Sequence, residues 1–368
     1  MSWPKTAIIH EWLVSYAGSE RCVESFTNIW KEADVFALVD FLNEEQRNMI
    51  LKGKKANTTF IQKLPLARKK HRYYLPLFPT AIERLNLSDY KLIISSNHAV
   101  SKGIKTNKNQ LHISYCHSPM RYAWDQSDQY LTGIKGSFAK AFMNYLRNWD
   151  LKSAKNVNHF IANSHHIAEK IKRIYKRNSV VIYPPVDVDK FEVSEKKEDY
   201  YLIASRFVPY KKVDLVVEAF NQMPDKKLIV IGSGPEKEKI KNIAGSNIEF
   251  LPHQPTDKLK EYLMKAKAFV FAAEEDFGIV VVESMACGTP VIALNKGGTA
   301  ESVINGKTGI LFNEQNPDSI VDAVKKFEKS IDNFDVQTIR KHAEKFSRPI
   351  FEKNISEFVI AKLKKFNN

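Results

Sequence analysis

The sequence predicts an α/β protein built from two doubly wound parallel-sheet domains that face a central cleft. Three observations predict this class. Short apolar segments alternate with segments of helical spacing, the apolar segments are unbroken runs, and two prolines with a charged stretch interrupt the alternation once, near residue 184. Alternating strands and helices favour parallel sheets, and strands covered on both faces are continuously apolar. At roughly 150 residues per domain, a chain of 368 residues also suggests two domains.

The first predicted domain covers residues 1–183. Its first strand is the apolar segment 6–10 (TAIIH), which polar residues follow. Further strands are expected at 34–39, 90–95, 111–116 and 159–162. Helical spacing predicts a helix over 20–30, and the N-cap pair Asn163-Ser164 begins another that runs to about residue 176.

The second predicted domain covers residues 184–350, after Pro184-Pro185 and the charged stretch 192–199. Strands are expected at 200–205, 227–231, 248–251, 268–271 and 290–293. Helices are expected at 213–222, 237–244, 257–265, 280–286 and 300–304, and a final helical region from about 318 to 365. We expect residues 351–368 to pack back toward the first domain as a C-terminal helix. Ligands of such sheets bind beyond the carboxyl ends of the strands.

The composition excludes several classes of protein. Hydrophobic residues make up 43% and charged residues 27%, a globular balance that excludes disorder and coiled coil. Three widely spaced cysteines exclude a disulfide framework and a zinc ribbon, and they fit a reducing compartment. No apolar run reaches about 18 residues, and the first residues lack a signal-peptide core. We therefore expect a soluble, cytoplasmic protein.

The net charge of +14 is concentrated in one segment. Residues 51–110 hold thirteen Lys and Arg residues and two acidic residues, which accounts for +11 of the total. The cations of residues 52–72 lead into the apolar and aromatic run 73–79, a pattern typical of an interfacial anchor. A solvated surface and a nucleic-acid patch are the alternatives. We favour docking of residues 52–78 on an anionic membrane surface, and we expect no nucleic-acid partner.

The most informative stretch is AAEEDFGIVVVESMACGTP, residues 272–290. Glu275 lies in a predicted strand-to-helix loop, and Glu283 lies in the first turns of the following helix. The amides of residues 278–280 come at the helix N-terminus, where N–H groups and the helix dipole bind phosphate. The two carboxylates can accept hydrogen bonds from sugar and ribose hydroxyls. A solvated helix position is the alternative for Glu283, but its apolar neighbours predict a buried helix, where a carboxylate needs a partner.

This stretch, with its E-x7-E spacing, resembles the signature of the family 4 glycosyltransferases, which are retaining enzymes with the GT-B fold of two Rossmann-like domains. The segments 285–292 and 297–301 continue the resemblance. It implies that Glu275 contacts hydroxyls of the donor sugar and that Glu283 holds the nucleotide ribose. The residues that it places at the diphosphate are Phe277, Gly278, Ile279 and Val280.

A second match is the stretch 205–214 (SRFVPYKKVD), which is similar to the family's strand-end Arg followed by Lys. The resemblance places Arg206 and Lys211 on the donor diphosphate. Cations there stabilise the charge that builds as the glycosidic bond breaks. A surface salt-bridge pair is the alternative. The residues expected to line the nucleotide cleft or to lie near the base are Ser233, Gly234, His253 and Gln254.

A third match is the stretch 115–125 (YCHSPMRYAWD), which is closely similar to one typical of bacterial mannosyltransferases that build O-antigen and exopolysaccharide. His117 follows a buried strand, so we expect it to point into the cleft, and the resemblance implies a contact with the donor sugar. Ala17-Gly18 departs from the family's glycine pair, although Gly18 still permits close approach. The residues expected to shape the acceptor site are Arg121, Tyr122, Trp124 and Asp125.

The residues and the resemblance together predict a retaining glycosyltransferase. We expect it to move mannose from GDP-mannose to a lipid-diphosphate-linked saccharide acceptor, in the biosynthesis of O-antigen, capsule or exopolysaccharide, at the inner face of the plasma membrane. No metal or other cofactor is expected, because two cations and a helix dipole offset the diphosphate charge; Asp187-Val188-Asp189 is interpreted as a linker turn. The alternatives are a UDP-sugar-dependent transferase, an epimerase or phosphorylase of the same fold, and a nucleic-acid-binding protein that uses residues 51–110.

Overall fold

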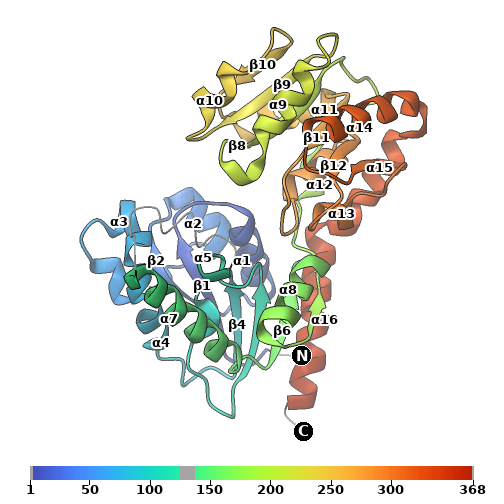
Figure 1. The fold of residues 1–368 in the computed structure, drawn as a ribbon. Helices are drawn as coiled ribbons and strands as arrows, with labels where there is room; N and C mark the ends of the chain where they lie inside the picture. The colour runs from blue at the N-terminus through green and yellow to red at the C-terminus, as the bar shows by residue number, and fades with distance from the viewer. Residues whose placement is uncertain (1–2, 125–136, 367–368) are drawn as a thin grey trace. The chain divides into compact units, whose positions relative to one another are not determined.

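The computed structural model describes residues 3–124 and 137–366, and the chain divides into two compact units (Figure 1). Unit 1 comprises Met1–Pro185 and Phe351–Asn368, and unit 2 comprises Val186–Ile350. Each unit is built around a sheet whose neighbouring strands pair in parallel. The predicted α/β class with two doubly wound parallel sheets is confirmed.

The sheet of unit 1 has seven strands in the order β3-β2-β1-β4-β5-β6-β7. They are β1 (Thr6–Leu13), β2 (Asp34–Asp40), β3 (Asn57–Thr58), β4 (Leu92–Asn97), β5 (Leu111–Cys116), β6 (His159–Ala162) and β7 (Ser179–Val181). The chain proceeds outward from β1 to β3 on one side and from β4 to β7 on the other, so the strand order reverses between β1 and β4. Ligands of open parallel sheets bind beyond the carboxyl ends of the strands at such a reversal.

Helices cover both faces of this sheet. They are α1 (Gly18–Ile29), α2 (Glu44–Leu51), α3 (Ala67–Lys70), α4 (Phe78–Glu83), α5 (Arg121–Trp124), α7 (Ser137–Ala154), α8 (His165–Tyr175) and α16 (Arg348–Phe366). One apolar core joins α1, α2 and α16 to one face, and a second core joins α4 and α7 to the other. α16 contributes Phe351, Ile355, Val359 and Leu363, whose spacing of four places them along one side of the helix.

The sheet of unit 2 has six strands in the order β10-β9-β8-β11-β12-β13. They are β8 (Tyr201–Arg206), β9 (Leu228–Ser233), β10 (Ile248–Leu251), β11 (Ala268–Phe271), β12 (Val291–Leu294) and β13 (Gly309–Phe312). Its helices are α9 (Val213–Asn221), α10 (Lys237–Asn242), α11 (Thr256–Lys265), α12 (Ile279–Ala286), α13 (Thr299–Ser302), α14 (Pro317–Lys329) and α15 (Val336–Ala343). The strand order reverses between β8 and β11.

Local side-chain chemistry explains where several elements begin. The hydroxyl of Ser164 accepts the N–H of Ile167 at 3.1 Å and caps α8, as predicted. The helical region expected from about 318 to 365 consists of the helices α14, α15 and α16, because Asp335 caps α15 after a break and α16 begins at Arg348. β4 begins at Leu92 and not at residue 90, because the N–H of Tyr90 closes a turn onto Leu87.

Cys22, Cys116 and Cys287 are not joined in disulfides and are fully buried, each at 0% exposed. Burial raises the pKa of Cys287 to about 12, so this thiol stays protonated. In residues 3–124 and 137–366, no helix combines the length and the apolar character needed to cross a bilayer.

Candidate active site

Two strand ends of unit 2 bring the predicted cations together with the first glutamate of the motif. Arg206 is the last residue of β8, and Lys211 ends the 3₁₀ turn η5 (Pro209–Lys211). Glu275 lies in the loop between β11 and α12. β8 and β11 are adjacent parallel strands, so their carboxyl ends meet at one edge of the sheet. The strand order of unit 2 reverses between these strands, which is where open parallel sheets bind ligands.

An ion pair joins Lys211 to Glu275 at this edge. The Nζ atom of Lys211 contacts Oε1 of Glu275, and the two side chains are 17% and 18% exposed. The ammonium also lies 5.5 Å from the ring centre of Tyr210 and 5.7 Å from that of Phe271. The sequence predicts both charged residues as site residues but does not predict their direct contact. The pair presents a cation suited to phosphate beside a carboxylate suited to hydroxyls.

Arg206 is an exposed cation beside this pair. Its Nη2 atom donates to the hydroxyl of Tyr210 at 2.5 Å. The contact orients the guanidinium. Two cations with different partners thus stand beyond β8, and their roles on a diphosphate remain predictions.

The loop before α12 has a shape that depends on glycine. Gly278 is the N-cap of α12 and has a φ of 86°, in the left-handed region that favours glycine. The N–H of Gly298 donates to the carbonyl of Glu275 at 2.7 Å. A Cβ atom at Gly298 would lie 2.3 Å from the Cα atom of Phe277. The segment after β12 therefore supports the backbone of the glutamate loop at van der Waals distance.

The other predicted residues of the motif differ in exposure. Ile279 and Val280 form the first turn of α12 and are half-buried. Glu283 is 8% exposed on the same helix, which excludes a solvated helix position. Phe277 is 3% exposed, and its ring centre lies 5.7 Å from that of Phe346. Its side chain therefore packs inside unit 2, and its backbone is the part that lies beside Gly278.

The G-x-G segment at the end of β9 keeps two strand ends close together. Gly232 has a φ of 149°, and a Cβ atom there would lie 1.9 Å from the carbonyl oxygen of Ser205. Gly234 has a φ of 158°, and its Cβ would lie 2.3 Å from the carbonyl oxygen of Phe207. Ser233 between them is exposed. Both glycines thus permit the close approach of β9 to the segment that carries Arg206.

His253 and Gln254 follow β10, which is an edge strand of the sheet. His253 is exposed, and the amide of Gln254 donates to the carbonyl of Pro252 at 2.9 Å. β10 lies two strands away from β8, which corresponds to about 10 Å at the usual strand separation. This placement sets them apart from the cations, and their role near the base remains a prediction.

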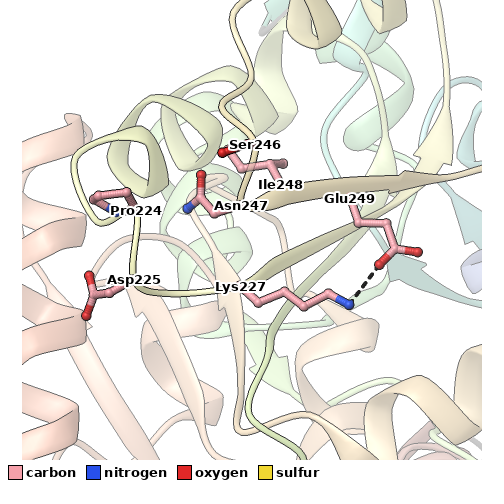
Figure 2. Close-up of a pocket in the computed structure, with 7 residues that line it drawn as sticks. All are labelled: Pro224, Asp225, Lys227, Ser246, Asn247, Ile248 and Glu249. Atoms are coloured by element: carbon pink, nitrogen blue, oxygen red, sulfur yellow. Dashed lines mark ion pairs between the residues drawn. The ribbon is translucent and has the colours of Figure 1, made fainter.

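A surface hollow of about 550 Å³ lies at the opposite end of the same sheet (Figure 2). It is lined by Pro224, Asp225, Lys227, Ser246, Asn247, Ile248 and Glu249. These residues precede β9 and β10 or begin β10, and Lys227 pairs with Glu249 at 2.9 Å across it. The hollow is therefore at the amino ends of the strands and contains none of the predicted site residues.

In unit 1, the predicted residue Gly18 follows β1, next to the reversal point of the sheet, and the predicted residue His117 follows β5, one strand beyond it. His117 directly follows β5 and is 8% exposed, and its Nε2 atom lies 2.9 Å from the hydroxyl of Ser96 at the end of β4. Gly18 opens α1 after the N-cap residue Ala17. The N–H of Ala17 donates to Glu20 at 3.1 Å, so the departure from a glycine pair is accommodated by a capping contact.

The predicted acceptor residues Arg121, Tyr122 and Trp124 form the short helix α5, and Asp125 lies outside the described residues. Tyr122 is 6% exposed. The indole N–H of Trp124 donates to Asp150 at 2.8 Å, so one edge of this ring is fixed from α7. Their contact with an acceptor remains a prediction.

Two family profiles match the chain. That of the group 1 glycosyl transferases matches residues 186–345, and that of glycosyltransferase family 4 matches residues 18–190. The chain belongs to glycosyltransferase family 4. The two matches together span residues 18–345 and include the segments around Arg206, Glu275 and His117.

Family members with curated names share about 30% identity with parts of the chain. An uncharacterized glycosyltransferase of Methanocaldococcus jannaschii is 31% identical over 199 residues, which is 52% of this chain and 55% of that protein. A GDP-mannose-dependent alpha-(1-6)-phosphatidylinositol monomannoside mannosyltransferase of Mycolicibacterium smegmatis is 30% identical over 170 residues, 38% of this chain and 44% of that protein. The matches thus span about half the length of these relatives.

Solved structures show the GT-B fold of the family. Anabaena Alr3699/HepE in complex with UDP superposes with a TM-score of 0.71 and 16% identity, over 97% of this chain and 100% of that chain. Sucrose-phosphate synthase from Thermosynechococcus elongatus superposes with a TM-score of 0.73 and 16% identity, over 98% and 100%. At these identities the likeness establishes the fold.

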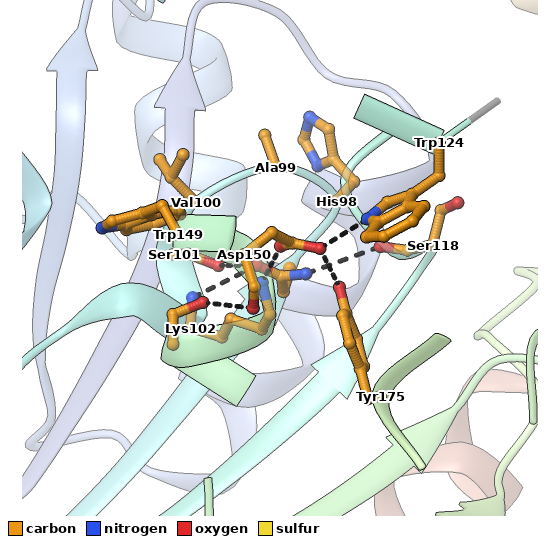
Figure 3. Close-up of polar contacts among 12 residues, drawn as sticks. His98, Ala99, Val100, Ser101, Lys102, Ser118, Trp124, Trp149, Asp150 and Tyr175 are labelled. Atoms are coloured by element: carbon orange, nitrogen blue, oxygen red, sulfur yellow. Dashed lines mark hydrogen bonds and ion pairs between the residues drawn. The ribbon is translucent and has the colours of Figure 1, made fainter. Parts of the chain in front are cut away.

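Unit 1 also contains a buried polar cluster that the family motifs do not predict. Figure 3 shows Lys102, Trp124 and Tyr175 converging on Asp150. Lys102 and Asp150 are both 0% exposed and form an ion pair. Burial, and then the charge of Asp150, raise the pKa of Tyr175 well above its ordinary value, so its hydroxyl remains a donor. The sequence around Lys102, which follows a buried strand, and around Asp150, which lies in an amphipathic helix, does not predict that the two residues are in contact.

In the D-x-D segment, residues 187–189, an arginine side chain binds the first aspartate. Arg348 donates to Asp187 at 2.5 Å and 3.0 Å through Nε and Nη2, and Lys190 donates to it at 3.2 Å. Within residues 3–124 and 137–366, no three His, Cys, Asp or Glu side chains gather in a way that suits a metal ion. Catalysis without a metal remains a prediction.

Proposed function

We propose that the protein is a retaining glycosyltransferase that moves a sugar from a nucleotide-diphosphate donor to a saccharide acceptor, with mannose from GDP-mannose as the first candidate. The observation that supports this most is the Lys211–Glu275 pair beside Arg206, at the carboxyl ends of β8 and β11. Cations bind phosphate, and carboxylates accept hydrogen bonds from sugar hydroxyls. Both kinds of side chain lie together at this edge of unit 2.

The proposed chemistry uses this edge of unit 2 to hold the leaving group. The bond between C1 of the sugar and the diphosphate oxygen breaks, and its electron pair stays on the diphosphate. Arg206, Lys211 and the N-terminus of α12 stabilise that charge. Glu275 accepts hydrogen bonds from sugar hydroxyls. The acceptor oxygen bonds to C1 on the face that the diphosphate leaves, and its proton passes to the departing phosphate.

The donor base is tested by thermal shift with GDP-, UDP- and ADP-sugars. The similarity to a GDP-mannose-dependent mannosyltransferase favours GDP-mannose, whereas HepE was solved with UDP and makes a UDP-sugar the alternative. A ligand that binds the folded state at 100 times its Kd adds about 2.7 kcal/mol of stability, which is readily measured. Stabilisation by none of the three classes would contradict a nucleotide-sugar donor. Conversion of a labelled donor without acceptor would indicate an epimerase instead.

Replacing Arg206 by alanine is expected to lower kcat/KM for transfer by about 100-fold, because one cation of the departing diphosphate is lost. The side chain is exposed, so the melting temperature should change little. Lys241→Ala is the matched control, since it removes an exposed cation from α10 of the same unit. Initial rates with radiolabelled donor measure both variants. Equal rates for Arg206→Ala and the wild type would contradict the role of Arg206.

We also propose that unit 1 docks on an anionic membrane through the basic aromatic segment, residues 52–78. Among the described residues, four of the ten large hydrophobic side chains that are exposed lie in this segment: Phe60, Leu66, Tyr73 and Leu77. The exposed cations Arg68, Lys69, Lys70 and Arg72 lie among them. Apolar side chains that enter the headgroup boundary, flanked by cations, suit an interfacial site. Docking would bring the enzyme to a lipid-diphosphate-linked acceptor, as expected in surface polysaccharide biosynthesis.

Charge removal in this segment should weaken membrane binding. Changing Arg68, Lys69, Lys70 and Arg72 to serine is expected to reduce co-sedimentation with phosphatidylserine-containing vesicles by at least 100-fold in affinity, since each cation contributes about 1 kcal/mol. The matched control changes the exposed Lys241, Lys325, Lys326 and Lys329 of unit 2 to serine. Equal loss in both variants would indicate attraction by net charge alone. Binding that is indifferent to anionic lipid would contradict the docking proposal.

A further inference from the structure

Tyr210 lies between the two cations that the proposed function places on the diphosphate. It is the central residue of η5, between Arg206 at the end of β8 and Lys211. Its hydroxyl accepts a hydrogen bond from Nη2 of Arg206 at 2.5 Å, and its ring centre lies 5.5 Å from Nζ of Lys211. One half-buried side chain therefore contacts both cations, one through its polar tip and the other through its ring.

Backbone hydrogen bonds fix the loop that carries these three residues. The N–H of Phe207 donates to the carbonyl of Ser233 at 2.9 Å, which ties the start of the loop to the end of β9. Pro209 begins η5, where its ring fixes the backbone angle φ at about −65°. The N–H of Lys211 donates to the carbonyl of Val208 at 2.9 Å and closes the turn. The loop thus sets where the two cationic side chains begin, and their remaining freedom lies in their side-chain torsions.

The ammonium of Lys211 has two rings and one carboxylate as neighbours. Phe271 ends β11 and is 1% exposed, and its ring centre lies 5.7 Å from Nζ of Lys211. Tyr210 supplies the second ring, and Glu275 supplies the carboxylate. A cation within about 6 Å of a ring centre is attracted by the quadrupole of the ring, which brings no opposite formal charge. The two rings therefore help to hold the ammonium in place without neutralising it.

The guanidinium of Arg206 needs a partner more than the ammonium does, because its side chain is exposed. A long exposed side chain adopts many rotamers, and ordering it at the moment of binding is unfavourable. A tyrosine is a stiff partner, since its side chain has two torsions. A carboxylate would hold the guanidinium more strongly and would compete with a diphosphate for it. A guanidinium also has five N–H donors, so a contact at Nη2 does not prevent the others from binding phosphate oxygens.

We propose that Tyr210 is a positioning residue for the donor diphosphate, which holds Arg206 through its hydroxyl and Lys211 through its ring so that both cations meet the leaving group in a fixed arrangement. The diphosphate in this statement rests on the proposed function. The two contacts of Tyr210 are properties of the loop itself.

Two substitutions separate the hydroxyl from the ring. Tyr210→Phe should lower kcat/KM for the donor about ten-fold, because Arg206 remains but is no longer held, and misplacement by about 1 Å costs up to about 100-fold. Tyr210→Leu should lower it about 100-fold, because the contact with Lys211 is lost as well. Tyr262→Phe is the matched control, since it removes the hydroxyl of another half-buried tyrosine of unit 2, on α11, and should retain kcat/KM within about two-fold. Equal kcat/KM in Tyr210→Phe and the wild type would overturn the role of the hydroxyl.

A double variant shows whether the hydroxyl acts through Arg206. If it does, Tyr210→Phe should have no further effect on kcat/KM in an Arg206→Ala background, because the group that it positions is already absent. A general structural defect would instead multiply the two separate losses, to about a thousand-fold in the double variant. Multiplied losses would therefore overturn the proposal for Arg206.

Nuclear magnetic resonance tests the contact with Lys211 without relying on catalysis. An aromatic ring shifts the resonances of protons near its face, so the ε-methylene protons of Lys211 report on the ring of Tyr210. In protein labelled with ¹³C-lysine, and assigned with a Lys211→Arg variant, we expect these resonances to move in Tyr210→Leu and to stay near their wild-type positions in Tyr210→Phe. Unchanged resonances in Tyr210→Leu would overturn the positioning of Lys211.

These measurements keep the failure of this inference apart from the failure of the proposed function. A wild-type protein that neither transfers sugar nor binds GDP or UDP in calorimetric titrations would contradict the proposed function, while the Lys211 resonances would still support or overturn its contact with Tyr210. Transfer by the wild type together with unchanged kcat/KM in Tyr210→Leu would leave the proposed function intact and would overturn the role of Tyr210.

Discussion

Glu275→Gln is expected to lower kcat for sugar transfer by about a thousand-fold, the upper range for loss of one charged contact to a transition state. Two effects act together. The amide is a weaker acceptor for sugar hydroxyls than the carboxylate. The ammonium of Lys211 also loses its partner, with which it shares a half-enclosed position at 17% and 18% side-chain exposure. A thousand-fold loss corresponds to about 4 kcal/mol of transition-state stabilisation.

The neighbouring residue supplies the control for this experiment. Glu274 carries the same group in the same loop but is exposed, so Glu274→Gln should retain kcat within about two-fold, as for most surface changes. Single-turnover rates with labelled donor separate chemistry from product release. If both glutamine variants lost activity equally, the loss would result from the reduced negative charge of the loop and not from a specific contact of Glu275. A Lys211→Met/Glu275→Gln double variant would then measure the coupling of the pair.

Lys102→Met is expected to lower the free energy of unfolding of unit 1 by about 3–5 kcal/mol, the cost of leaving a buried charge without its partner. Both Lys102 and Asp150 are 0% exposed, so water cannot replace the ammonium. Trp124 and Tyr175 still donate to Asp150 but carry no charge. Urea unfolding followed by tryptophan fluorescence reports on unit 1 alone, because all five tryptophans lie in its sequence.

A second substitution should restore part of this loss. In Lys102→Met/Asp150→Asn the buried charge is removed, while an amide oxygen remains to accept from Trp124 and Tyr175. Lys105→Met is the control for removing a lysine, because Lys105 is 72% exposed and pairs loosely with Glu83 at 3.8 Å. Similar stability of Lys102→Met and Lys105→Met would contradict a buried ion pair of this strength.

Much of the fold follows from local pattern. The strands β5, β10 and β11 lie at the bounds that the sequence predicts. The unbroken apolar run of β11 reflects burial on both faces of the sheet. Short or polar elements escape such reasoning. β3 has two residues and pairs only with β2, and its sequence carries no strand signal. The apolar residues of α7 do not follow a regular helical spacing. Their burial depends on packing against strands and helices that are remote in the sequence.

The candidate site divides in the same way. Arg206, Lys211 and Glu275 follow predicted strands, and the carboxyl ends of adjacent parallel strands must converge, so their neighbourhood is predictable. Their mutual contacts are not, because Lys211 and Glu275 are 64 residues apart and the ion pair depends on how two loops fold. The same holds for Lys102 with Asp150, 48 residues apart. The spacing of apolar residues in the sequence does not show which charged side chains will be buried.

The three buried cysteines make the molecule ready for site-specific labelling. Thiol reagents need an accessible thiolate, and all three native side chains are at 0% exposure, so none has to be removed first. A cysteine introduced at an exposed position such as Lys108 in unit 1, with a second at Lys325 in unit 2, would accept a pair of fluorescent dyes. Energy transfer between the dyes would then follow the separation of the two units, in single molecules, as nucleotide sugars and acceptors are added.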